Sequence, residues 1–256
     1  MWYRIKTYLR FLWQSTNQHG VHSPFVYQLV TTCFYDTKSY TAYKALKAYK
    51  KQLLKNNTII SVTDLGPGSQ QSNTPKRHVA TIAKHSGSTL ARTKFLYRLT
   101  QYFACKTSLE LGTSLGLATQ ALCLGHKNNH ITTIEGCPKL SEIAQKNLLQ
   151  YHKQLTFITG DFYKTLKQIS HPTYDIIFFD GNHTKKATLS YFEILLNHTH
   201  NDTLFIFDDI YWSKDMTEAW ETIKQHPKVT VTIDTYFWGL VFFRTEQAKQ
   251  HFKIRL

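Results

Sequence analysis

Ser108-Leu-Glu-Leu-Gly-Thr-Ser-Leu-Gly116 ends a strand-like apolar run in a turn that contains two glycines. A helical pattern, Leu117–Gly125, follows directly, and the next apolar run, His130–Glu135, ends in a carboxylate. A strand, a glycine turn, a helix and a second strand with an acidic end are typical of a fold that binds adenosine-containing ligands. The sequence therefore predicts an α/β fold with a ligand site at the carboxyl ends of its strands.

The same alternation continues along the second half of the chain. Helical patterns such as Lys139–Tyr151 and Thr184–Asn197 separate the apolar runs. Strands separated by helices of this length pair in parallel, because a parallel crossover needs a dozen or more residues. We expect a doubly wound α/β sheet whose strands include Thr107–Leu111, His130–Glu135, Leu155–Thr159, Asp175–Asp180 and Thr203–Asp208.

The end of the chain follows a different pattern. After a helical stretch at Ser213–His226, the apolar runs Val229–Asp234 and Leu240–Arg244 are separated only by Thr235–Gly239. So short a connection cannot form a crossover, so the last strand turns back as an antiparallel hairpin. The expected sheet has seven strands, mostly parallel, with an antiparallel last strand.

Positive charge is concentrated in the first 88 residues, which hold 12 Lys and Arg against two acids, whereas residues 89–256 hold 19 against 15. We expect a basic, mainly helical N-terminal extension at 1–88, packed on a catalytic or ligand-binding domain at 89–256. The helical pattern Trp2–Trp13 joins aromatic and apolar residues to Arg4, Lys6 and Arg10. Packing on the body or on a second subunit of a homodimer is the ordinary interpretation, and a membrane surface or nucleic acid is the alternative.

Other sequence features exclude several classes of protein. No apolar stretch approaches the ~18 residues of a membrane span, and the first residues lack the features of a signal peptide. The four cysteines show no metal-ligand spacing and are interpreted as reduced thiols. We expect a cytoplasmic protein.

Two glycine-containing segments compete as the ligand turn: Val62–Ser69 and Ser108–Gly116. An adenosine ligand calls for an acidic residue at the end of the next strand, to accept from the ribose hydroxyls. No acid follows Asp64 until Glu110, whereas the second segment is followed by Glu135. The second segment is favoured, and a nicotinamide-binding loop is disfavoured because neither segment matches GxGxxG.

Five motifs in order, SLELGTSLG, TTIEG, ITGDF, DIIFFDGNH and LFIFDDIYW, resemble the class I S-adenosylmethionine (SAM)-dependent methyltransferases. They are most similar to the catechol and caffeoyl-CoA O-methyltransferase group and its bacterial relatives. The resemblance covers roughly residues 90–246 and does not include the N-terminal extension. It implies a SAM-dependent methyltransferase that acts on an oxygen of a small-molecule acceptor.

The same resemblance implies a set of cofactor contacts. Glycines in the turn let the backbone approach the ligand, Ser114 offers a hydroxyl to the methionine carboxylate, and Glu110 accepts from the amino group. Asp161 accepts from the adenine, and Phe162 lies beside it. Each has a structural alternative, such as a turn glycine or a helix N-cap. The full expected set is Glu110, Gly112, Thr113, Ser114, Gly116, Glu135, Gly136, Asp161, Phe162 and Asp180.

Methyl transfer to oxygen needs an aligned acceptor that loses its proton to a base or near a metal. The resemblance places a divalent cation such as Mg²⁺ on Asp180, Asp208 and Asp209, where Asp209 stands in place of the family's Asn. His183 occupies the position of the family's general-base lysine, so Asp180 and His183 are the expected catalytic residues. The structural alternative for His183 is capping of the next helix or orientation of the ligand.

The acidic pair is followed by Tyr211 and Trp212, and Trp238 lies in the hairpin connection; each is interpreted either as a wall of the acceptor pocket or as packing. Two other functions stay open. The basic extension is compatible with an RNA methyltransferase, although no NPPY-like segment follows the fourth strand. A SAM-binding protein without catalysis is the second alternative.

Overall fold

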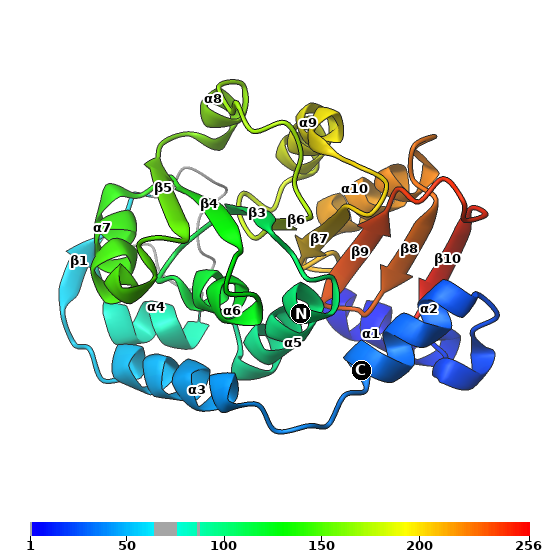
Figure 1. Ribbon diagram of the computed structural model, residues 1–256, viewed down its shortest axis with the longest axis horizontal. Coiled ribbons are helices and arrows are strands. Elements are labelled where there is room, and N and C mark those ends of the chain that lie inside the picture. The colour runs from blue at the N-terminus through cyan, green and yellow to red at the C-terminus, as the bar shows by residue number, and fades with distance from the viewer. Residues whose placement is uncertain (1, 64–75, 86–87) are drawn as a thin grey trace. The chain divides into compact units, whose positions relative to one another are not determined.

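The computed structural model of the chain describes residues 2–63, 76–85 and 88–256 (Figure 1). It divides into two compact units, Lys38–Ile169 and a second made of Met1–Thr37 with Ser170–Leu256. The division expected near residue 88 is not one of these boundaries and stays a prediction. The competing glycine segment at Val62–Ser69 lies mostly outside the described residues.

The unit Lys38–Ile169 contains three parallel strands, β3 (Thr107–Leu111), β4 (His130–Glu135) and β5 (Leu155–Thr159). All three have the bounds expected from the sequence. Strand β4 lies between the other two, and its register places Thr133 opposite Glu110 of β3. The carboxyl ends of β3 and β4 therefore lie side by side, and the glycine turn follows the first of them.

Helices of this unit begin where the sequence supplies a cap. The Thr89 side chain accepts from the backbone of Arg92 at the start of α5, and Pro138 occupies the first turn of α7. A small antiparallel pair, β1 (Ile59–Ser61) and β2 (Lys76–His78), precedes α4. The helices are α3 (Thr41–Leu54), α4 (Val79–His85), α5 (Leu90–Tyr102), α6 (Leu117–Gly125), α7 (Pro138–Asn147) and α8 (Phe162–Leu166).

One apolar core of this unit joins the first helices to the glycine turn. Leu53 of α3 and Val79 of α4 are buried in the same cluster as Leu115 and Leu117, which flank Gly116. Burial of such side chains stabilises by about 1.5 to 3 kcal/mol each. The described part of residues 41–85 therefore supports the turn directly.

The other unit contains five strands: β6 (Ile176–Phe179), β7 (Leu204–Asp208), β8 (Val231–Asp234), β9 (Trp238–Phe242) and β10 (Gln250–Lys253). Strands β6 and β7 are parallel and fully buried, as their continuous apolar sequences predict. Strand β9 pairs antiparallel with both β7 and β8, which confirms the hairpin.

The sequence-based count of seven strands was one too low, and the antiparallel strand is not the last. Apart from the small pair β1–β2, the described residues of the two units hold three and five strands, and β10 pairs parallel to β8 after the hairpin. Its sequence, Gln250-His-Phe-Lys253, is mostly polar and two of its residues are exposed. Such a strand lacks the apolar alternation on which strand prediction relies.

Helices of this unit again start at side-chain caps. Thr184 accepts from the backbone of Ala187 and Ser213 accepts from that of Met216. Among the described residues, no helix is long and apolar enough to cross a membrane. The helices are α1 (Trp2–Gln14), α2 (Pro24–Leu29), the π-helix η2 (Val30–Phe34), α9 (Lys185–Leu195) and α10 (Lys214–Gln225).

Candidate functional site

The glycine turn after β3 has a backbone that only certain residues tolerate. Gly112 has φ +103° and Gly116 has φ +77°, both in the left-handed region. A Cβ on Gly116 would lie 2.7 Å from Leu148 Cδ1. Ser114 also has a positive φ, +48°. The turn therefore needs glycine at Gly116 for space as well as for conformation.

Glu135 connects this turn to the end of β4. One carboxylate oxygen accepts the backbone N–H of Ser114 at 2.7 Å, and the other accepts that of Cys137 at 2.8 Å. The side chain is almost buried. These two hydrogen bonds fix the carboxylate beside the glycine turn.

Glu110 is the most unusual carboxyl group of this unit. It is fully buried, and only Oε2 has partners, the hydroxyls of Thr119 at 2.5 Å and Thr133 at 2.6 Å. Among the described residues, Oε1 has no hydrogen-bond partner. Burial raises the pKa of Glu110 to about 7, against the opposing effect of the two threonine hydrogen bonds.

Asp161 lies at the start of α8, where its side chain accepts the backbone N–H of Lys164 at 3.0 Å. The structural alternative, a helix N-cap, is therefore present. One carboxylate oxygen is used in this way, which leaves the adenine contact of Asp161 and Phe162 as a prediction. Gly136 is half-buried and Thr113 is buried beside the turn, with its hydroxyl 2.5 Å from that of Thr133.

The sequence did not indicate the role of Tyr49 on α3. Its hydroxyl is buried and donates to the carbonyl of Leu115 at 2.6 Å, within the glycine turn. Desolvation raises the pKa of Tyr49, so this hydroxyl stays a donor. Nothing local in the helical sequence around Tyr49 points to a partner 66 residues away.

In the other unit, the ends of β6 and β7 bring acidic side chains together. Asp180, His183 and Asp208 each offer one ligand atom, and these atoms all lie within 4.8 Å of one another. His183 Nε2 is 3.8 Å from Asp180 Oδ1. Asp180 and His183 are partly exposed, whereas Asp208 is buried. This arrangement combines two carboxylates with an imidazole at one edge of the strands.

The backbone turn between Asp180 and His183 sets the positions of these two residues relative to each other. Asn182 lies between Asp180 and His183 with φ +52°, and its side-chain amide donates to Tyr191 OH on α9 at 3.0 Å. A positive φ at a non-glycine residue is uncommon and is tolerated best by Asn and Asp. The turn therefore redirects the chain after β6 so that His183 returns toward Asp180.

Trp238 holds Asp208 from the antiparallel strand. Its indole N–H donates to Asp208 Oδ1 at 2.7 Å, in the register that places the two residues opposite each other on β9 and β7. Trp238 is fully buried. Of the two interpretations of this residue, the structure shows packing with a specific hydrogen bond.

Asp209 lies outside the cluster that the other three residues form. It has φ +52°, its N–H donates to the carbonyl of Phe237 at 2.8 Å, and its carbonyl accepts from the N–H of Trp212. Neighbouring residues of a strand point to opposite faces. The observed cluster therefore contains His183 instead of Asp209, together with Asp180 and Asp208.

Tyr211 and Trp212 differ in their surroundings. The Tyr211 hydroxyl donates to Asp234 Oδ2 at 2.6 Å, and its ring stacks on Tyr236 with centroids 5.1 Å apart. The guanidinium of Arg4 lies 4.7 Å from the ring centroid of Trp212. All these contacts lie within one unit. The hydrogen bond and the ring stacking of Tyr211 favour the interpretation that this residue packs the core.

The donor atoms of the cluster fit a divalent cation. Carboxylate oxygens suit Mg²⁺ and Mn²⁺, and an imidazole nitrogen is more typical of transition metals. Asp208 accepts the Trp238 N–H with Oδ1, which fixes the carboxylate within the cluster. The cluster is thus compatible with the expected metal site, with Asp180 and Asp208 as the shared residues.

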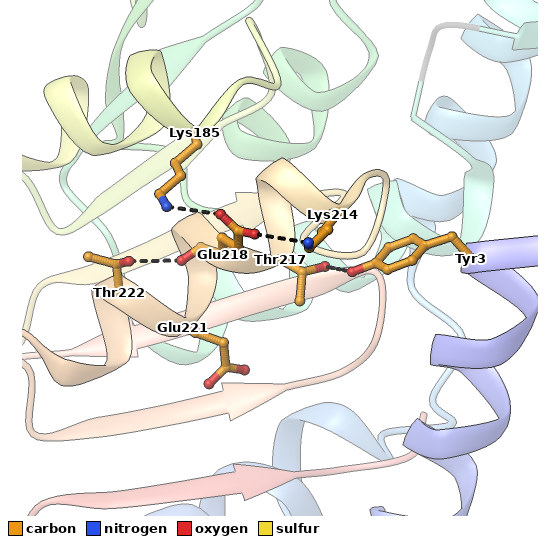
Figure 2. A pocket seen from close by; sticks show the side chains of 7 residues that line it. All are labelled: Tyr3, Lys185, Lys214, Thr217, Glu218, Glu221 and Thr222. Carbon is orange, nitrogen blue, oxygen red and sulfur yellow. Dashed lines mark hydrogen bonds and ion pairs between the residues drawn. The ribbon is translucent and has the colours of Figure 1, made fainter.

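A surface pocket lies elsewhere in the same unit, along α1 and α10 (Figure 2). Ion pairs of Glu218 with Lys185 and with Lys214 cross it. None of the expected site residues lines this pocket, so it carries no catalytic assignment. Its lining residues are Tyr3, Lys185, Lys214, Thr217, Glu218, Glu221 and Thr222.

Comparisons with known proteins match the region that contains these residues. A family model described as a methyltransferase domain matches residues 109–210. The catechol O-methyltransferase of Niastella koreensis is 32% identical over 123 residues, which are 46% of this chain and 55% of that protein. The match thus spans about half the length of that relative.

Solved structures show the same fold over most of the chain. An O-methyltransferase from Bacillus cereus in complex with SAH has a TM-score of 0.55 at 19% identity, covering 83% of this chain and 95% of its own. An SAH-bound methyltransferase from Podospora anserina has a TM-score of 0.60 at 14% identity, covering 88% and 97%. The expected methyltransferase-type α/β fold is confirmed.

Proposed function

We propose that this chain is a class I methyltransferase similar to the catechol and caffeoyl-CoA O-methyltransferase group, and that it transfers a methyl group from SAM to an oxygen of a small molecule. The observation that carries the proposal is the hydrogen bond from the Ser114 amide to the Glu135 carboxylate. It brings the glycine turn and the acidic strand end together, the two elements that bind the backbone side and the ribose of an adenosine ligand.

The unit Lys38–Ile169 provides the cofactor contacts in this proposal. Glu135 accepts from the ribose hydroxyls, and Ser114 donates its hydroxyl to the methionine carboxylate. The free oxygen of Glu110 accepts from the methionine amino group, which gives that buried atom a partner. Asp161 and Phe162 bind the adenine, and Gly112, Thr113, Gly116 and Gly136 shape the backbone around the ligand.

The unit that contains Ser170–Leu256 provides the acceptor chemistry. The acceptor oxygen attacks the methyl carbon as the carbon–sulfur bond of the sulfonium breaks, so a carbon–oxygen bond forms and the demethylated cofactor leaves. His183 takes the proton from the acceptor hydroxyl, since histidine exchanges protons near neutral pH. Asp180 orients His183 and supports the positive charge that it acquires.

A divalent cation would be held by Asp180 and Asp208. When bound, it would lower the pKa of an acceptor hydroxyl. The Trp238 hydrogen bond to Asp208 Oδ1 fixes that carboxylate beside Asp180. Asp209 is not needed in this arrangement.

Calorimetric titration with SAM and with its demethylated product tests the cofactor part. We expect micromolar binding to the wild type and a loss of about 100-fold in Glu135→Ala, since charged hydrogen bonds contribute roughly 1.5 to 3 kcal/mol. Glu142→Ala is the matched control, because that exposed glutamate forms a surface ion pair with Lys139. Absence of binding to the wild type would refute the proposal.

The acceptor is tested separately with saturating SAM. Catechol is the first candidate, because the similar protein of Niastella koreensis is a catechol O-methyltransferase. Mg²⁺ and Mn²⁺ are each added, and each is removed with a chelator. Product formation that depends on the catechol concentration supports an O-methyltransferase of small molecules. Methyl incorporation into RNA alone, or SAM binding without turnover of any acceptor, would favour one of the two alternatives.

A further inference from the structure

Helix α1 carries an apolar face that no part of the described chain covers. Trp2, Ile5, Leu9, Leu12 and Trp13 are all exposed, with Trp2 at 83% and Trp13 at 85%. At 100° per residue these five side chains fall within an arc of about 100°. We call these five residues the exposed face of α1. Single exposed apolar residues are ordinary, but a continuous helical stripe with a tryptophan at each end is not.

The opposite side of α1 is fastened to its own unit. Tyr3 OH donates to Thr217 Oγ1 on α10 at 2.7 Å (Figure 2). Tyr236 OH donates to the carbonyl of Arg4 at 2.7 Å, and Phe11 is buried with its ring 5.6 Å from that of Tyr236. The exposed face is therefore held outward by contacts on the other side of the helix.

The turn after α1 is fastened as well. Thr16 N–H donates to the carbonyl of Lys253, and its carbonyl accepts the N–H of Arg255. Lys253 Nζ also donates to the side chain of Gln14 at 2.7 Å. Because both ends of α1 are bound, its exposed face is presented without a large cost in conformational entropy.

The charged side chains of α1 are all positive. Lys6 and Arg10 are exposed and border it on one side, and no acidic residue occurs before Asp36. The whole chain has a formal net charge of +14. A partner that suits this surface combines an apolar interior with a negatively charged boundary.

We propose that α1 docks on an anionic lipid bilayer, parallel to its surface. The exposed face enters the boundary between headgroups and acyl chains, and Lys6 and Arg10 lie among the lipid phosphates. Tryptophans at both ends suit this boundary because the indole ring is amphipathic. Among the described residues no helix can span a membrane, so the association is peripheral and reversible.

Two other occupants fit the same surface less well. A second copy would bring two helices without acidic residues against each other, and their like charges would repel. Nucleic acid would be bound by a dense set of basic side chains, whereas five apolar side chains make up this face. The bilayer is the partner whose chemistry matches both features.

Flotation with lipid vesicles tests the proposal on the full chain. We expect binding to vesicles of phosphatidylcholine with phosphatidylglycerol, weaker binding to pure phosphatidylcholine, and a decrease in high salt. Leu9→Glu places a charge in the centre of the exposed face and lowers the partition coefficient by about tenfold or more. Leu149→Glu is the matched control, because Leu149 is a similarly exposed leucine in the other unit.

Further measurements test whether a loss of vesicle binding comes from misfolding of the variant. Both variants change exposed side chains, so thermal unfolding and SAM binding stay as in the wild type. Lys6→Gln combined with Arg10→Gln reduces binding to the anionic vesicles and leaves binding to neutral ones unchanged. Equal effects of Leu9→Glu and Leu149→Glu would overturn the proposal. So would no vesicle binding, or a lipid-free dimer that Leu9→Glu dissociates in ultracentrifugation.

Discussion

The glycine turn and the acidic cluster position their carboxylates in different ways. In the turn, Glu135 is held by backbone N–H groups of Ser114 and Cys137, which lie in the segments that directly follow β3 and β4. In the cluster, Asp208 is held by the side chain of Trp238, which reaches it only because β9 runs antiparallel beside β7. The turn thus depends mainly on backbone conformation, whereas the cluster depends on side chains and on the pairing of the hairpin.

The largest effect on activity is expected from a substitution of Asp180 in the acidic cluster. In Asp180→Asn we expect kcat to fall about 1000-fold, because the variant loses the charge that orients His183 and binds a cation. The Kd for SAM should stay within about threefold of the wild type if the cluster serves the acceptor alone. Asp202→Asn, which changes an exposed aspartate paired with Arg244, is the control.

Methyl-transfer kinetics and calorimetry on the same preparations measure both quantities. A SAM Kd that rises as much as kcat falls would place Asp180 in cofactor binding and would contradict the separation of roles.

A second test uses the buried carboxyl of the turn region. The pKa of Glu110 in the folded protein, about 7, lies above its ordinary value of 4.5 because of burial. The folded state therefore retains a proton that the unfolded state releases. The associated stabilisation is complete below about pH 4.5 and is lost as the pH rises to about 7. Between pH 5 and pH 8 we expect the wild type to lose about 2 kcal/mol more unfolding free energy than Glu110→Gln.

Urea denaturation at the two pH values measures this difference. Glu193→Gln changes an exposed carboxylate of the other unit and should retain the wild-type pH dependence. An identical pH dependence in wild type and Glu110→Gln would show that Glu110 is ionised throughout this range.

The smallest effect is expected at the hydrogen bond to Asp208. Trp238→Phe keeps an aromatic ring but removes the N–H donor, so we expect kcat to fall about tenfold and stability by about 1 kcal/mol. Trp220→Phe is a matched control: Trp220 is also fully buried, and its indole nitrogen has no hydrogen-bond partner among the described residues. Equal kcat values in the two variants would mean that the hydrogen bond to Asp208 has no role in catalysis.

The sequence predicted the turn region better than the cluster. Strands β3, β4 and β5 have the expected bounds because apolar runs, glycines and caps are local signals. Strand β9 begins at Trp238, two residues before the expected Leu240, because it pairs with Asp208 of β7. Strand β10 was missed, since a polar edge strand has no hydrophobic period.

In the candidate site, too, local signals were predicted and contacts between distant residues were not. The sequence singled out Glu110 just before the end of a strand, and Glu135, Asp180 and Asp208 at strand ends, because acids in apolar runs are a local signal. Tyr49 and the role of Trp238 were not found, because their partners lie 66 and 30 residues away. Membership of His183 in the cluster depends on the positive φ of Asn182, which asparagine tolerates well but which the sequence alone does not fix.

The Trp238 indole also gives the protein an internal optical reporter. Its emission depends on the electric field along the ring, and the nearest strong field source is the carboxylate that accepts its N–H. A cation or a protonated acceptor arriving at Asp208 would therefore change the intensity or wavelength of that emission without any added dye. The chain has five tryptophans, so the difference between wild type and Trp238→Phe isolates the signal. Occupancy of the acidic cluster can then be followed in stopped-flow mixing, before any methyl group has moved.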